Sequence, residues 1–191
     1  MTTPATRKPR ADALANRQKL LEAARFHFTQ DGPDASLNEI AKRAGVGAGT
    51  LYRHFPTRDD LVAAVYGNEL EELGNAVDDY LATMTADEAL DAWAERFIEY
   101  ASTKRGLGEA LKALRERGDV RVNPRGVLTE SMDKLIDAGR QAGTITSDAD
   151  GEDLLLSMAG LWSMPNDERF EERARRIVRL TLGGLRHAGR A

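Results

Sequence analysis

Apolar residues recur every three or four positions from Ala13 onward, a spacing that places them on one face of a helix. In the first such segment the face consists of Leu14, Leu21, Ala24 and Phe28. The pattern, interrupted by glycine, proline and polar turns, predicts helices at about 13–30, 36–44, 48–55, 59–84, 86–103, 107–117, 125–142, 154–164 and 167–188. No segment shows the sustained alternation of β-branched residues that is typical of strands, so the predicted fold is all-α.

Start and stop signals locate the two short helices and the long helix that follows them. Ser36 and Glu39 fit a capping box, in which the Glu39 amide donates to the Ser36 hydroxyl and the Ser36 amide donates to the Glu39 carboxylate. Thr57 and Asp60 resemble a second capping box at the start of the long helix. Gly45 stands where a residue of left-handed conformation would end the helix before it.

Residues 36–55 therefore have the sequence form of a helix-turn-helix, two short helices joined by a tight turn. Ala41 is small enough for the helices to cross closely, and Val46 fills the turn. Three apolar side chains are predicted to pin the pair to the first helix: Ile40, Leu51 and Phe55. The outer face of the second helix carries groups that can donate to phosphates or base edges, namely Thr50, Tyr52, Arg53 and His54.

The sequence SLNEIAKRAGVGAGTLYRHFPTRDDL at residues 36–61 resembles the tetracycline-repressor (TetR) family of transcriptional regulators. The resemblance implies an N-terminal three-helix helix-turn-helix DNA-binding domain. It also implies a C-terminal helical domain that dimerises and binds a small-molecule effector. For this chain we expect a flexible basic arm at 1–12, a DNA-binding domain at 13–58, and a ligand-binding and dimerisation domain at 59–191.

The resemblance also implies roles for individual residues. Thr50 and Tyr52 match positions that contact phosphate, and His54 matches a recognition-helix position close to the backbone or bases. Arg58 matches a basic position that grips phosphate, and Ser36 matches a hydroxyl that caps a helix and touches phosphate. The predicted DNA-binding set is Ser36, Gly47, Ala48, Gly49, Thr50, Tyr52, Arg53, His54 and Arg58.

Two positions depart from the family pattern. Gly47 stands where the family often has serine, and Ala48 stands where a long polar or basic side chain is common. Because these residues offer few groups for direct base readout, we expect affinity to depend on Arg53, Tyr52, Arg58 and the arm, and specificity to depend partly on DNA shape. The arm residues Arg7, Lys8 and Arg10 could reach a minor groove, or they could belong to a solubilising tail.

Charge is divided unevenly along the 191 residues. The net charge of −4 is made up of +5 over residues 1–58 and −9 over residues 59–191. The basic front suits phosphate and the acidic remainder repels it. The absence of cysteine excludes a disulfide scaffold and thiolate metal sites. With 41% hydrophobic residues and no apolar run long enough to cross a bilayer, a cytoplasmic globular protein without a membrane span is expected.

The C-terminal segment carries two further predicted surfaces. Apolar residues at helical spacing can line an effector cavity or simply form core; the predicted ligand set is Trp93, Phe97, Tyr100, Leu111, Met132, Leu135, Ile136, Met158 and Trp162. The segment 154–164 is apolar almost all round, which requires burial on every side. A homodimer interface or the centre of a monomeric bundle would satisfy it; the predicted interface set is Leu154, Leu155, Ala159, Gly160, Ile177, Val178, Leu182 and Leu185.

No catalytic residue, cofactor or metal site is predicted, so the chain is not expected to be an enzyme. No nucleophile has a plausible base, the three histidines form no ligand pair, and the carboxylates near Asp150 are expected to stabilise a helix N-terminus. The predicted function is a sequence-specific DNA-binding regulator, a repressor that a small, largely apolar effector releases from a palindromic operator. Two alternatives are an architectural DNA binder without effector control and a small metabolite-binding helical protein.

Overall fold

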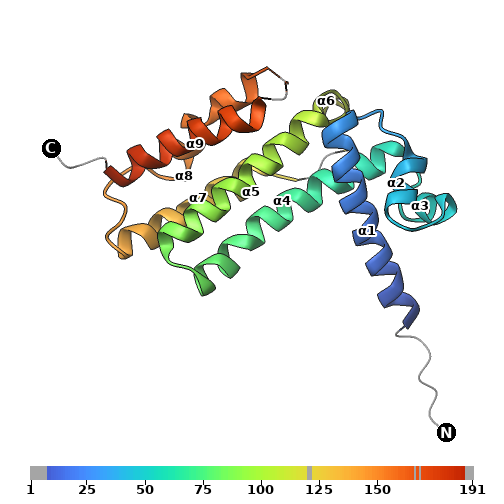
Figure 1. The fold of residues 1–191 in the computed structure, drawn as a ribbon, viewed down its shortest axis with the longest axis horizontal. Coiled ribbons are helices and arrows are strands. Elements are labelled where there is room, and N and C mark those ends of the chain that lie inside the picture. Colours follow the sequence, from blue (N-terminus) through green and yellow to red (C-terminus); the bar gives the residue numbers. More distant parts are fainter. Residues whose placement is uncertain (1–7, 120–121, 166, 168, 188–191) are drawn as a thin grey trace, which may run out of the picture. The chain divides into compact units, whose positions relative to one another are not determined.

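The computed structural model describes residues 8–119, 122–165, 167 and 169–187, which form helices and no strands (Figure 1). This confirms the predicted all-α fold. In chain order the helices are α1 (Lys8–Asp31), α2 (Leu37–Arg43), α3 (Ala48–His54), α4 (Arg58–Thr83), α5 (Ala86–Gly106), α6 (Gly108–Glu116), α7 (Pro124–Gln141), α8 (Gly151–Ser157), the 3₁₀ helix η1 (Ala159–Ser163) and α9 (Phe170–His187).

The helices group into two compact units, and the boundary between them does not follow the order of the chain. The first unit contains α1, α2, α3, α4 as far as Asn68, and α6. The second contains α4 from Glu69, α5 as far as Arg105, α7, α8, η1 and α9. The first unit is therefore larger than segment 13–58, because the start of α4 and the distant helix α6 contribute to its core.

Helix α1 begins earlier than its sequence pattern predicts. Residues Lys8–Asp12, which were expected to belong to a flexible arm, lie in the helix, whereas Arg7 lies outside the described residues. Leu14 was expected in the buried face but is 67% exposed. The buried face starts at Leu20 and continues through Leu21, Ala24 and Phe28. The physical reason is that residues 11–15 are all exposed, so nothing packs on this part of the helix.

The helix-turn-helix forms as predicted, and its turn depends on one glycine. Gly45 has a φ of +70°, its amide donates to the Lys42 carbonyl, and the next amide, of Val46, donates to the Ala41 carbonyl. This pair of hydrogen bonds is a Schellman motif, which satisfies the last carbonyls of α2 and reverses the chain. Ile40 and Ala41 of α2 are buried, as is Leu51 of α3.

The predicted single helix at 154–164 is wrong. Asp150 and Asp153 form a reciprocal capping box that starts α8 at Gly151, and α8 ends at Ser157 before the 3₁₀ helix η1. The Ser157 hydroxyl donates to the Leu154 carbonyl at 2.7 Å, where it competes with the backbone at the helix end. The segment is not buried all round either: Leu156 is 56% exposed, and the residues that follow are exposed at Ala159 and Gly160.

A tertiary contact holds this segment in place. Arg105 of α5 donates to the carbonyls of Leu161 at 3.1 Å and Met164 at 2.5 Å, and its guanidinium lies over the Phe170 ring at 4.4 Å. Burial lowers the pKa of Arg105 from its ordinary value. Because these two carbonyls are satisfied from α5, the chain between α8 and α9 does not need to continue as a helix.

A close backbone approach inside the first unit yields a stability prediction. A Cβ atom on Gly106 would lie 2.4 Å from the Phe28 carbonyl oxygen, whereas a Cβ on Gly108 would meet nothing within 4 Å. Gly106→Ala should therefore lower the free energy of unfolding by about 1–3 kcal/mol through overpacking. Gly108→Ala, the matched control at the start of α6, should be neutral or slightly stabilising. Equal urea midpoints for the two variants would contradict the expected close contact.

Candidate nucleic-acid interface

The face of α3 that points away from the core carries the predicted DNA-binding groups. Leu51 and Phe55 are 1% and 3% exposed and anchor the helix, whereas Tyr52 is 49% exposed. Arg53 is exposed, and Thr50 and His54 are half-buried. One helix thus separates its residues into an anchoring face and an outward face with a phenol, a guanidinium and an imidazole. These groups can donate to phosphates or to base edges.

The glycines around the start of α3 are not required by the protein's own packing. Gly47 is the N-cap in an extended conformation, and a Cβ on Gly47 or Gly49 would meet nothing within 4 Å. Neither residue has a positive φ. Ala48 between them is exposed. The surface at the start of α3 is therefore smooth and open, which permits close approach of another backbone.

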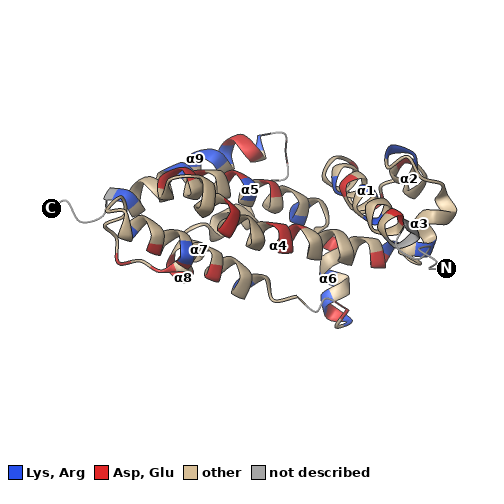
Figure 2. Ribbon diagram, turned by 90° about the horizontal axis from the view of Figure 1, so that it is seen from below, with Lys and Arg blue, Asp and Glu red and all other residues tan. Residues whose placement is uncertain are grey.

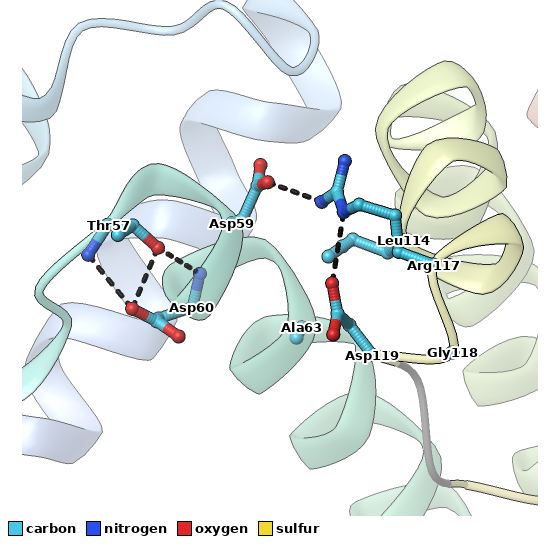
Figure 3. A pocket seen from close by; sticks show the side chains of 8 residues that line it. All are labelled: Thr57, Asp59, Asp60, Ala63, Leu114, Arg117, Gly118 and Asp119. Carbon is cyan, nitrogen blue, oxygen red and sulfur yellow. Dashed lines mark hydrogen bonds and ion pairs between the residues drawn. The ribbon is translucent and has the colours of Figure 1, made fainter.

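The two predicted capping boxes differ in completeness. At α4 the Thr57 amide donates to Asp60 at 2.9 Å and the Asp60 amide donates to the Thr57 hydroxyl at 3.1 Å, which confirms that box (Figure 3). At α2 the Glu39 amide donates to the Ser36 hydroxyl at 3.4 Å, as predicted. The Glu39 carboxylate, however, accepts from Lys42 at 3.4 Å. Ser36 is exposed beside this cap.

Arg58 has a structural task that sequence reasoning missed. One of its terminal nitrogens, Nη1, donates to the carbonyls of Pro33 and Ala35, both at 2.7 Å. The half-buried side chain therefore ties the start of α4 to the turn between α1 and α2. No local pattern signals this contact, because its partners are 23 and 25 residues away.

The start of α4 is also linked to the end of α6 within the first unit. Arg117 donates to Asp59 through Nη2 at 2.5 Å and to Asp119 through Nε at 3.0 Å (Figure 3). The Asp119 hydrogen bond, followed by the charge of Asp59, raises the pKa of Arg117 above its ordinary value. These residues border a polar hollow of about 390 Å³ that is also lined by Thr57, Asp60, Ala63, Leu114 and Gly118.

Two arginines near the helix-turn-helix lie over aromatic rings, and sequence reasoning singled out neither. Arg17 of α1 lies 5.5 Å from the centre of the Phe55 ring, at the end of α3. Arg43 of α2 lies 3.6 Å from the centre of the Phe26 ring of α1. Lys and Arg residues are seen on α1 and at the end of α2 (Figure 2). Stacking positions a guanidinium while its N–H edge can still meet an anion.

Most of the predicted ligand residues are buried. Trp93 and Phe97 stack with ring centres 5.6 Å apart, and the half-buried Trp162 lies edge-on to Phe97 at 6.1 Å and to Tyr100 at 6.4 Å. The structure thus joins α5 and η1 through one aromatic cluster in the second unit. The remaining members, Met132, Leu135, Ile136 and Met158, are buried in the same unit, whereas Leu111 is buried in the first unit.

The predicted dimer residues divide into two groups. Leu154, Val178, Leu182 and Leu185 are at most 5% exposed within the single chain. Leu155 and Ile177 are half-buried, and Ala159 and Gly160 are exposed. Two exposed leucines that sequence reasoning omitted lie on the same elements: Leu156 on α8 and Leu180 on α9, the latter 78% exposed.

The second unit contains a partly buried acidic cluster. Arg96 pairs with Glu69 at 3.2 Å, Glu72 at 2.6 Å and Glu99 at 3.0 Å, and Glu69 is 3% exposed. Burial opposes the charge of Arg96, but Glu69, with Glu72 and Glu99, outweighs it, so the pKa of Arg96 is raised. The described residues hold no cluster of three or more potential metal ligands. None of the helices in the described part of the chain combines the length and apolarity needed to span a membrane.

A helix-turn-helix with an outward hydrogen-bonding face, followed by a helical second unit, defines the class of helix-turn-helix transcriptional regulators. Residues 20–65 match the family model for bacterial regulatory proteins of the tetR family, and residues 85–187 match the model for the C-terminal domain of SbtR-like transcriptional regulators. The chain therefore belongs to the TetR family of transcriptional regulators, as its helix-turn-helix sequence predicted.

Solved structures support this assignment over nearly the whole chain. A TetR transcriptional regulator from Streptomyces coelicolor is 41% identical, with a TM-score of 0.81 over 89% of this chain and 98% of that one. A TetR regulatory protein from Mycobacterium vanbaalenii is 31% identical, with a TM-score of 0.70 over 93% and 98%. An HTH-type transcriptional regulator of Staphylococcus aureus is 45% identical over 62 residues, which span 32% of this chain and only 34% of that relative.

The geometry of Arg58 leads to a prediction that separates folding from DNA contact. Arg58→Ala removes a charged donor from two carbonyls and should lower the free energy of unfolding by about 1–2 kcal/mol. Arg53→Ala, a matched loss of one guanidinium from an exposed position, should leave stability within about 0.5 kcal/mol of wild type. Chemical unfolding followed by circular dichroism measures both. Identical midpoints for the two variants would show that Arg58 does not hold the turn.

Proposed function

We propose that this TetR-family regulator is a repressor that binds a palindromic DNA operator as a homodimer. A small, largely apolar effector releases it. The observation that carries the proposal is the outward face of α3, where Tyr52, Arg53 and His54 stand clear of the buried Leu51 and Phe55. The open surface at Gly47 and Gly49 supports it, because a Cβ there would disturb no protein contact. Close approach to a DNA strand gives these glycines a purpose that packing does not.

Two-fold symmetry turns this surface into a sequence reader. In a dimer the two copies of α3 enter successive major grooves of an operator with two half-sites. Because Gly47, Ala48 and Gly49 supply little direct readout, operator preference depends partly on the shape and deformability of the duplex. A DNA operator as partner implies that the protein acts in the cytoplasm. No enzymatic step is part of the proposal.

The proposed effector site is the aromatic cluster of the second unit. Its members are apolar and close together, with Trp93, Phe97, Tyr100 and Trp162 joined by ring contacts of 5.6–6.4 Å. Trp162 lies on a 3₁₀ segment, which is shorter and less regular than the helices around it. An effector that fits one arrangement of this cluster better than another shifts the population and so changes the affinity for DNA. Helix α4, which runs through both units, carries the coupling.

DNA binding gives the direct test of the proposal. Duplexes selected by the wild-type chain from fragments of the source genome should bind Tyr52→Ala at least tenfold more weakly at 0.1 M salt, because the outward phenol is removed. Arg53→Ala should reduce the slope of log affinity against log salt by about 0.9 for each phosphate that the variant no longer neutralises. Fluorescence anisotropy measures both, with Lys112→Ala on α6 as the matched removal of one exposed cation. Equal binding of selected and random duplexes would favour the architectural alternative, and unchanged binding by both variants would contradict the assigned face.

The homodimer makes a separate prediction about the exposed leucines. Leu180 on α9 is 78% exposed, and Leu14 on α1 is 67% exposed. We expect Leu180→Glu to convert the dimer to a monomer, because a buried unpaired carboxylate would oppose association. Leu14→Glu makes the same chemical change outside the proposed interface and should leave the dimer intact. Sedimentation velocity reports the two masses, and a dimeric Leu180→Glu variant would rule out this interface.

A further inference from the structure

A basic hollow lies beside the helix-turn-helix, on the side where α1 meets the turn after α2. Its volume is about 520 Å³. It is lined by Lys19, Glu22, Ala23, Arg25 and Phe26 of α1, and by Arg43, Ala44 and Gly45. Three cations thus face one carboxylate across a surface that none of the predicted DNA-binding residues belongs to. This excess of positive charge makes the hollow complementary to an anion.

The cations of the hollow are held by an ordered apolar floor. The Arg43 guanidinium lies 3.6 Å from the centre of the Phe26 ring, and Phe26 is 43% exposed. The Phe26 ring packs perpendicular to His27 at 5.4 Å, and His27 Nδ1 lies 2.9 Å from an Asp31 oxygen. Stacking occupies the flat face of Arg43 and leaves its edge for hydrogen bonds, so less side-chain freedom is lost when an anion binds.

The hollow lies close to the start of the recognition helix. Gly45 lines it, and α3 begins at Ala48, three residues further on. Three residues span at most about 11 Å, which is comparable to the width of about 12 Å of a B-DNA major groove. A phosphate at the edge of the groove that receives α3 therefore lies within reach of the long side chains Lys19, Arg25 and Arg43.

We propose that this hollow docks a phosphate of the DNA strand that flanks the recognition groove. The inference rests on the proposed DNA-binding function and adds a contact surface to it. The contact is independent of base sequence and contributes affinity and register. It supplements the thin direct readout of Gly47, Ala48 and Gly49.

The test uses the full chain and a duplex selected from the source genome, with a random duplex of equal length beside it. Lys19→Gln and Arg43→Gln should each weaken binding to both duplexes at least fivefold at 0.1 M salt. Each should also reduce the salt slope by about 0.9 per phosphate released, counted once per protomer. Glu22→Gln removes the one carboxylate of the hollow and should strengthen binding about twofold. Lys112→Gln, a cation of the same unit outside the hollow, should change neither quantity.

Each outcome has a distinct meaning. If the wild type binds its selected duplex and both hollow variants match Lys112→Gln, the docking is overturned and the proposed function stands. If the wild type binds no duplex, the proposed function itself fails. A weakening confined to the selected duplex would also overturn the docking, since a phosphate contact does not read bases. Inorganic phosphate that shifts amide resonances of the hollow, with duplex affinity unchanged in the variants, would assign it to a free anion and reject DNA. Matching far-UV circular dichroism excludes misfolding as the cause of any weakening.

Discussion

The recognition surface depends on the burial of two helices that are too short to be stable alone. Helices α2 and α3 have seven residues each, well below the length at which an isolated helix persists in water. Ile40 and Leu51 are at most 1% exposed, and Phe55 closes the end of α3 at 3%. The outward face of α3 therefore exists because its inward face is buried. Whatever shifts that core also shifts the groups that meet DNA.

Cations in the first unit serve two different ends, and their contacts distinguish them. Arg58 uses its Nη1 donor on carbonyls of its own chain, so it holds the fold as well as lying near the interface. Arg117 bridges carboxylates at the start of α4 and beyond the end of α6. Arg17 and Arg43 instead stack on rings, which orients them without using their hydrogen-bonding edges. Residue type alone would have treated all four as equivalent phosphate ligands.

The second unit is built around aromatic packing and compensated acid. Trp93 also donates from its indole nitrogen to the Leu73 carbonyl at 3.0 Å, which ties α5 to α4 within that unit. The carboxylates around Arg96 concentrate negative charge away from the helix-turn-helix segment in the sequence. An acidic second unit disfavours contact with phosphate, so the charge pattern supports docking through the basic residues of the first unit.

The sequence by itself determined the all-α class, the helix-turn-helix and its glycine turn, and the outward residues of α3, because these depend on spacing within about 25 residues. It also located the carboxylates that cap α8. Only the tertiary structure decided that Arg58 clamps a distant turn, that Leu14 has nothing to pack against, and that Arg105 holds a 3₁₀ segment where apolar periodicity predicted a helix. Periodicity reports which residues a helix could bury. Whether a partner is present to bury them, or to accept their hydrogen bonds, depends on segments far apart in the chain.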